Sequence, residues 1–233
     1  MNSYHKIAIW IVTVLVISSL PAWSQFEGTF TTTTTGTREG NTPFSITQEV
    51  SIKGKKIRSA MTAPGEQMGS LIIIFRGDKG RVITILDQAK VYMELSIKTI
   101  EEMMKNFPHD TNMVTVTRTG KKQKILGYNC EQIILQEGEA TIDIWGTSEL
   151  TFLRKAMQTM SEVQKQKVPQ WSKELDKLQV FPMKTIINAQ GTNAEMTVTS
   201  IQRKSLPESI FNVPAGYKKQ DLPAGQTGGQ KKR

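Results

Sequence analysis

The chain has 233 residues, a formal net charge of +9 at pH 7 and one cysteine. A single cysteine excludes an intramolecular disulfide, so the fold must be stable without cross-links. The positive charge favours anionic neighbours such as phospholipid head groups or lipopolysaccharide. Because the lysines are spread along predicted strands and are not gathered into one motif, we expect no nucleic-acid partner. A basic surface that only faces solvent is the alternative.

The first 24 residues are predicted to form a cleaved export signal. His5 and Lys6 give a short basic region, residues 7–17 are almost wholly apolar, and small residues precede Gln25. The apolar run of about eleven residues is shorter than the roughly 20 that a bilayer-spanning helix needs. An uncleaved membrane anchor is the alternative. We therefore expect cleavage after Ser24 and a mature protein that is soluble in the periplasm.

The first part of the mature chain shows the pattern of an antiparallel meander. Residues 26–37 favour a strand because they are rich in β-branched threonine, with a low-complexity linker as the alternative. In residues 44–52 apolar and polar side chains alternate, which is typical of a half-buried strand. In the next strand Arg58 lies on the face opposite Ile57 and Met61. Further strands are predicted over residues 71–75, 81–86 and 91–95.

An amphipathic helix is predicted next, capped by Ser96 and ended by Pro108. Charged residues occupy one of its faces, and its apolar stripe contains Ile97, Ile100, Met103, Met104 and Phe107. Methionine side chains are flexible and adapt to different ligand shapes. The stripe therefore indicates either a lid over an apolar cavity or a helix that simply packs on the sheet.

Strand character resumes after this helix. A basic turn is predicted at Gly120-Lys121-Lys122 and a second turn at residues 136–139. The strands around these turns are expected over residues 113–117, 128–135 and 140–145. Cys130 and Trp145 are predicted to be core positions, since both lie inside strand patterns.

A second amphipathic helix is predicted over residues 149–167 and a short helix around residues 171–178. The apolar stripe of the second helix includes Leu153, Met157 and Met160. A hairpin with arms at 183–189 and 196–201 follows. The closing segment is expected to place Phe211, Val213 and Tyr217 in the core. Residues 25–219 are predicted to form one domain, and residues 220–233 a disordered basic tail.

Candidate catalytic residues are few. After removal of the signal, His109 is the only histidine, and one histidine with one cysteine cannot form a multi-ligand zinc site. Cys130 lies in a strand pattern, where a buried and unreactive thiol is expected. No Gly-rich phosphate loop and no Gly-x-Ser-x-Gly motif occurs. We therefore expect a protein without enzymatic activity, cofactor or metal, and an enzyme that acts through His109 or exposed carboxylates is the alternative.

Two sequence motifs indicate a family resemblance: Gly-Tyr-Asn-Cys-Glu at residues 127–131 and Phe-Asn-Val-Pro-Ala-Gly-Tyr at residues 211–217. With them, residues 26–219 resemble an exported bacterial family known only as a domain of unknown function. In plan the chain is similar to the periplasmic lipoprotein carriers of the LolA/LolB type. That resemblance implies an α+β, mainly β fold: a strongly curved antiparallel sheet, an unclosed half-barrel, with about two helices on its concave face. In those carriers the apolar interior holds acyl chains.

The leading hypothesis is an exported, non-enzymatic binding protein that holds a lipid or acyl chain between the sheet and the covering helices. The expected apolar contacts are Ile100, Met103, Met104, Phe107, Leu153, Met157 and Met160. The alternative is a structural or interaction protein of the cell envelope, with a filled core and a basic surface that associates with anionic membranes.

Overall fold

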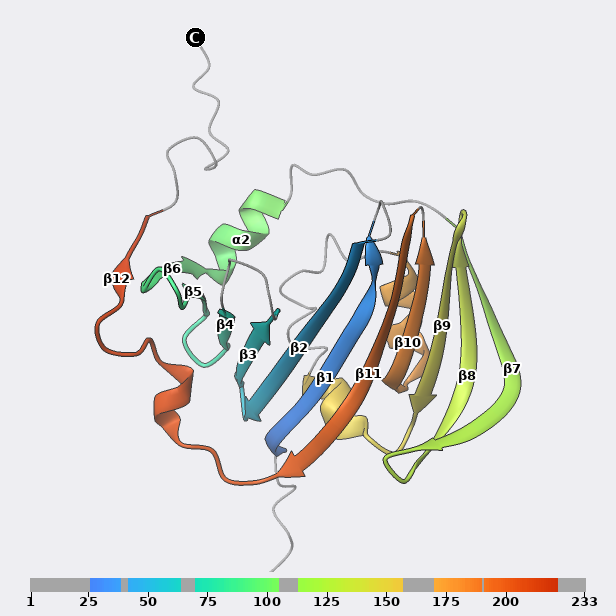
Figure 1. Cartoon of the computed structure of the whole chain (residues 1–233). Helices are drawn as coiled ribbons and strands as arrows, with labels where there is room; N and C mark the ends of the chain where they lie inside the picture. Colours follow the sequence, from blue (N-terminus) through green and yellow to red (C-terminus); the bar gives the residue numbers. More distant parts are fainter. Residues whose placement is uncertain are drawn as a thin grey trace, which may run out of the picture.

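The computed structural model describes residues 26–38, 42–63, 70–104, 113–156, 170–189 and 191–221. The described residues form twelve strands that belong to one sheet, with β12 and β7 at its two ends (Figure 1). Because β12 and β7 are not paired with each other, the sheet does not close into a barrel. The predicted fold class, a mainly β protein with a curved and unclosed antiparallel sheet, is confirmed.

The strands follow one another in the chain as β1 (Glu27–Arg38), β2 (Thr42–Lys53), β3 (Lys56–Thr62), β4 (Ser70–Arg76), β5 (Arg81–Leu86), β6 (Val91–Ser96), β7 (Val114–Ile125), β8 (Tyr128–Glu137), β9 (Ala140–Thr147), β10 (Phe181–Ala189), β11 (Thr192–Arg203) and β12 (Lys218–Lys219). Their order in the sheet is β12-β6-β5-β4-β3-β2-β1-β11-β10-β9-β8-β7. The predicted meander is therefore confirmed for β1 to β6. The pairing of β1 with β11 joins this meander to the second half of the chain.

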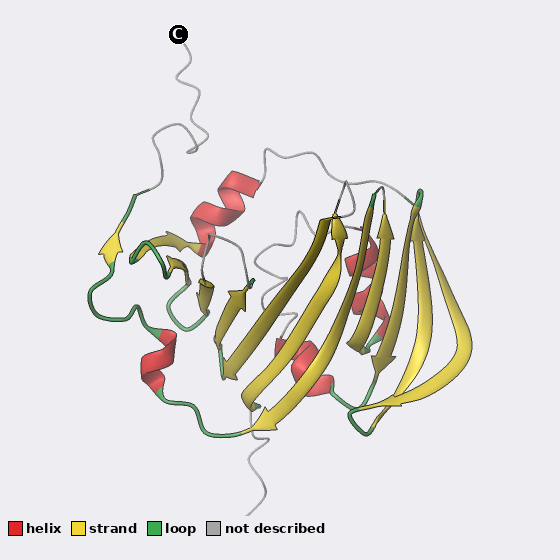
Figure 2. Cartoon of the chain, in the orientation of Figure 1, coloured by secondary structure: helices red, strands yellow, loops and turns green. Residues whose placement is uncertain are grey.

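Helical residues of the described chain lie in α2 (Ile97–Met104), at 151–156 and in α4 (Gln170–Leu178), with a 3-10 turn η2 (Glu208–Phe211) near the end (Figure 2). The Oγ atom of Ser96 accepts a hydrogen bond of 3.0 Å from the backbone N–H of Thr99, so the predicted N-cap is confirmed. The predicted extensions of the first helix to Phe107 and of the second to residue 167 lie outside the described residues. No described helix is both long and apolar enough to cross a bilayer.

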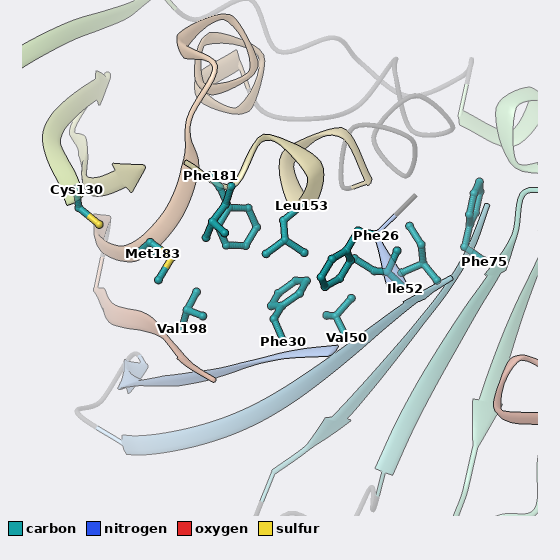
Figure 3. Packing of buried hydrophobic residues seen from close by; sticks show 12 residues of the cluster. Phe26, Phe30, Val50, Ile52, Phe75, Cys130, Leu153, Phe181, Met183 and Val198 are labelled. Atoms are coloured by element: carbon teal, nitrogen blue, oxygen red, sulfur yellow. The ribbon is translucent and has the colours of Figure 1, made fainter. Parts of the chain in front are cut away.

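One face of the sheet, which we call the helix face, packs against residues 151–156 and α4. Leu153 reaches from its helix into side chains of the central strands (Figure 3). The buried members of this cluster include Phe26, Phe30, Val50, Ile52, Ile57, Phe75, Phe181, Met183 and Val198. Under α4, Leu175 and Leu178 cover a second cluster on β8 and β9. Cys130 is buried and Trp145 packs against the first cluster, so both are core positions as predicted.

The opposite face, which we call the strap face, is covered over β3 to β5 by residues 204–217, the strap. Along β4, Ile72 and Ile74 alternate with side chains such as Phe75 that belong to the helix-face core, so they point to the strap face. Leu206 and the fully buried Phe211 of the strap pack on them. Burial of a Phe side chain contributes about 1.5–3 kcal/mol. The closing segment packs as predicted, but on the face away from the helices.

One local prediction differs from the structure. The predicted turn at Gly120-Lys121-Lys122 is wrong, because β7 runs through it with a register shift between Arg118 and Lys122. Gly120 has φ 75°, which allows the strand to absorb the extra residues as a bulge. At the end of the chain, Gln220 donates its backbone N–H to the carbonyl of Tyr92 over 2.8 Å, just after β12 pairs with β6. Residues 222–233, the rest of the predicted tail, lie outside the described residues.

Candidate ligand cleft beneath the C-terminal strap

The residues predicted to contact a ligand are distributed over different environments. Ile100 and Met103 lie half-buried on α2, and Leu153 is fully buried. The helix-face cluster around Leu153 includes Ile97 among its partly buried members but neither Ile100 nor Met103. The structure therefore does not bring these three predicted contacts together. Phe107, Met157, Met160 and the side chain of Met104 lie outside the described residues.

The helix face around Leu153 is filled by side chains. Phe26 and Phe152 stack with ring centroids 4.6 Å apart, and Phe30 meets the Phe181 ring edge-on at 5.5 Å. The guanidinium of Arg203 lies 4.4 Å from the centroid of the Phe152 ring. Leu153 therefore contributes to a packed core between its helix and the sheet.

The helix face also contains a buried cation, Arg154. Its side chain is 9% exposed, and its Nε and Nη1 atoms lack a hydrogen-bond partner among the described residues. Asp176 of α4 interacts with this charge: the pKa of Asp176 is raised by burial and lowered to a lesser degree by the charge of Arg154. A charge interaction therefore links residue 154 to α4.

A cleft of about 490 Å³ lies on the other face of the sheet, between the strap and strands β1 to β5. This volume falls in the range of about 300–1,000 Å³ that is typical of small-molecule sites. The residues that line the cleft are Thr29, Glu49, Ser51, Arg58, Ile72, Ile74, Ile85, Lys204, Ser205, Leu206, Pro207, Ser209, Ile210, Asn212 and Pro214. The cleft was missed by the sequence analysis, although the uninterrupted apolar run of β4 is the pattern of a strand buried on both faces.

The register of the strands divides the floor of the cleft into a polar and an apolar half. In one row across the sheet, Thr29 pairs with Ser51, Ser51 with Arg58, and Arg58 with Ile74. In the next row, Glu49 pairs with Ala60, Ala60 with Ile72, and Ile72 with Ile85. The polar residues therefore lie over β1 to β3, and the isoleucines over β4 and β5.

The start of the strap is anchored to the ends of β1 and β2. The carboxylate of Glu27 accepts a hydrogen bond of 2.5 Å from the backbone N–H of Leu206. Lys53 donates to the carbonyl of Leu206 over 2.6 Å and lies 3.1 Å from Glu27. The bond from Leu206 and then the one from Lys53 hold the pKa of Glu27 below its usual value.

The middle of the strap is anchored to β3 and β4. Arg76, which is buried, donates to the carbonyl of Phe211 over 3.1 Å and to Oδ1 of Asn212 over 2.8 Å. A second pair of hydrogen bonds joins Arg76 to Asp78 and lowers the pKa of Asp78 to about 2. Lys56 donates to Glu208 over 2.5 Å and lowers the pKa of that carboxyl.

The end of the strap is anchored to the turn between β5 and β6. The hydroxyl of Tyr217 donates to Oδ1 of Asp87, and Lys90 donates to the same oxygen over 3.0 Å. The Tyr217 hydroxyl first, and then Lys90, lower the pKa of Asp87. The Lys90 ammonium also lies 4.9 Å from the centroid of the Tyr217 ring. Three sets of polar contacts therefore hold the strap over the cleft.

Arg58 differs from the cations that anchor the strap. It is half-buried in the wall of the cleft, and no hydrogen bond or ion pair joins its guanidinium to any described residue. Its charge contributes only a minor part of the lowering of the Asp87 pKa. A guanidinium offers five N–H donors in a planar fork, so Arg58 has the donors to bind a carboxylate or phosphate.

The described residues offer little for covalent or metal chemistry. Burial raises the pKa of the Cys130 thiol, which makes it a poor nucleophile. Within the described ranges, no group of three or more His, Cys, Asp and Glu side chains is placed to hold a metal ion. His109 lies outside those ranges.

Comparison with known proteins identifies a family and a set of structural neighbours. The family model described as "Domain of unknown function (DUF4412)" matches residues 26–217. No curated protein sequence matches the chain. Among solved structures, PNGF-II is similar over 84% of the chain with a TM-score of 0.40 and 16% identity, but the match covers 31% of PNGF-II. The chain therefore spans about a third of that protein.

Two smaller proteins are matched over most of their length. The LolA superfamily protein NE2245 from Nitrosomonas europaea has a TM-score of 0.35 and 8% identity, over 82% of this chain and 91% of that one. LprF from Mycobacterium bovis has a TM-score of 0.37 and 9% identity, over 83% and 91%.

Proposed function

The chain belongs to the DUF4412 family of domains of unknown function, and we propose that it is a non-enzymatic binding protein that holds a ligand with an apolar part. The observation that carries this proposal is the cleft of about 490 Å³ between the strap and the sheet. Ile72, Ile74 and Ile85 in its floor are covered by the strap, so an alkyl chain would reach them by displacing strap side chains. Burial of alkyl groups there would provide about 0.8 kcal/mol per methylene. The ligand class we propose is a lipid or acyl chain.

The position of the cleft refines the hypothesis drawn from the sequence. That hypothesis placed the ligand on the helix face, where Leu153 is now part of a packed core. Ile100 and Met103 remain half-buried on α2 and stay candidates for a second apolar contact there. The strap face has both an open volume and a covering segment, so it is the better-supported position.

We also propose that the protein acts outside the cytoplasm and without catalysis. Residues 1–24 have the composition of an export signal, and the basic surface suits anionic envelope components. The buried Cys130 thiol supports a binding role over nucleophilic catalysis.

The experiment is to purify the protein under native conditions, from cells that express the full chain, and to identify co-purifying lipids by mass spectrometry. Ser209 is exposed and lines the cleft, so Ser209→Trp should fill the cleft without disturbing the core. Ser45→Trp, at an exposed position of β2 outside the cleft, is the matched control. Lipid should accompany the unmodified protein and the control but not Ser209→Trp. A protein that is empty in all three samples and ignores hydrophobic fluorescent probes would contradict the proposal.

A second candidate is a structural or interaction protein of the envelope, favoured by the edge strand β7. Its side chains Lys121, Lys122 and Lys124 are exposed, and Leu126 in the following turn is 50% exposed. Lysines on an edge strand also prevent pairing with other sheets, which explains them without a partner. This candidate predicts salt-sensitive binding to anionic vesicles that is lost when the three lysines are replaced by glutamine.

A further inference from the structure

The cleft beneath the strap is divided in a way that matches an amphiphile. Its isoleucine half lies over β4 and β5, and its polar half lies over β1 to β3. Arg58 stands at the boundary, because it pairs with Ser51 on one side and with Ile74 on the other. A single ligand in the cleft would therefore contact alkyl groups at one end and the guanidinium of Arg58 next to them.

Three cations that anchor the strap already have acidic or carbonyl partners. Lys53 binds Glu27 and the Leu206 carbonyl, Lys56 binds Glu208, and Arg76 binds Asp78. Arg58 has no such partner among the described residues, although it is half-buried. A charged group that is partly removed from water without a hydrogen-bond partner is unfavourable, and a bound anion would relieve that cost.

We propose that Arg58 binds the anionic head group of an amphiphile whose alkyl chain takes the place of strap side chains, such as Leu206 and Phe211, that now cover Ile72, Ile74 and Ile85. The inference rests on the proposed function and specifies its ligand: a carboxylate or phosphate attached to an aliphatic chain. The planar guanidinium fits both head groups, since each accepts two parallel N–H hydrogen bonds. The exposed carboxylate of Glu49, also in the cleft wall, makes a head group of higher negative charge less favourable.

Displacement of a neutral fluorescent probe, N-phenyl-1-naphthylamine, tests the inference. The competitors are dodecanoate, dodecyl phosphate and dodecanol, which share one alkyl chain and differ in the head group. We expect at least one of the two anions to displace the probe at a concentration about tenfold lower than dodecanol does. The anion that does so identifies the head group.

Variants connect this preference to Arg58. Arg58→Gln should remove the preference and leave the affinity for dodecanol within about twofold, while Arg58→Lys should retain part of it. Arg81→Gln, at an exposed cation on the same face of the sheet, should leave the preference unchanged. Glu49→Gln should increase the affinity for the anion about twofold or more and leave dodecanol unaffected, a result that does not depend on how well the Arg58 variants fold.

The failures of the two proposals are distinguishable. If the unmodified protein binds neither the probe nor any competitor, the proposed function fails and the inference fails with it. If all three competitors displace the probe equally, or if Arg58→Gln keeps the preference for an anion, only the inference is overturned.

Discussion

Lys56 and Glu208 are 152 residues apart in the sequence, yet Nζ of Lys56 donates to Oε2 of Glu208 over 2.5 Å. The pair joins β3 to the strap and lies on the surface. Surface ion pairs contribute little to global stability, because water and salt screen them. The function of this contact is therefore local: it keeps the strap in place above the cleft.

The first prediction concerns this contact. In Glu208→Gln the strap should open more often, while the midpoint of thermal unfolding stays close to that of the unmodified protein. Hydrogen exchange measured by mass spectrometry should show faster exchange in residues 205–217 and unchanged exchange in β1. Glu101→Gln, an exposed residue of α2, is the control and should change neither region. Equal exchange in the strap of Glu208→Gln and of the unmodified protein would contradict the prediction.

Arg76 also anchors the strap, but unlike the Lys56–Glu208 pair it is buried. Its guanidinium donates to the Phe211 carbonyl and to Asn212, so Arg76→Met leaves a buried acceptor without its donor. We expect a loss of about 2–3 kcal/mol in the free energy of unfolding, measured by urea denaturation. Arg81 pairs with Arg76 across the strands but is exposed, and Arg81→Met should cost less than about 1 kcal/mol. Similar losses in both variants would show that Arg76 contributes no more to the free energy of unfolding than the exposed Arg81 does.

The anchors of the strap give stability a defined pH dependence. The pKa of Asp78 is about 2 in the folded protein against an ordinary 3.8, and the pKa values of Glu27, Asp87 and Glu208 are also lowered. A depressed folded pKa stabilises the protein above the unfolded pKa, and this contribution is lost as the pH falls through the folded value. Stability should therefore decline between about pH 4 and pH 2. Asp78→Asn should reduce the slope of that decline, and an unchanged slope would contradict the assignment.

A substitution at Leu153 distinguishes a packed helix face from a helix face that binds a ligand. Because Leu153 is 0% exposed in a cluster with phenylalanine rings, Leu153→Ala should lower the free energy of unfolding by about 2–5 kcal/mol. Met103→Ala, at a half-buried position of α2, should cost clearly less. A Leu153→Ala variant as stable as the unmodified protein would indicate that the side chain faces a ligand space and not a core.

The sequence predicted the strand over residues 44–52 because apolar and polar side chains alternate there, and these residues form part of β2. The helix N-cap predicted at Ser96 is also confirmed. The bulge in β7 was missed because Gly120 followed by two lysines has the composition of a turn, and only the pairing partner β8 shows that the strand continues. Local composition cannot reveal a register shift.

The candidate site was harder to predict than the fold. Sequence periodicity placed Arg58 opposite Ile57, but it could not show that Ile74 pairs with Arg58 or that the strap covers both. Those relationships depend on register between strands and on contacts more than 100 residues apart, such as the bond from Arg76 to Phe211. The methionine stripes led to the prediction of a ligand on the helix face. They do not identify a site by themselves, because flexible apolar side chains occur in cores as well as in binding sites.

The central claim, that the ligand binds on the strap face, is tested most directly by methyl NMR of isoleucine during a titration with dodecanoate. Ile72, Ile74 and Ile85 line the cleft, whereas Ile133, Ile142 and Ile144 lie in the core under α4. We predict that the first three δ1-methyl signals shift with increasing ligand and that the second three stay in place. Shifts confined to Ile133, Ile142 and Ile144, or no shifts at all, would contradict the claim.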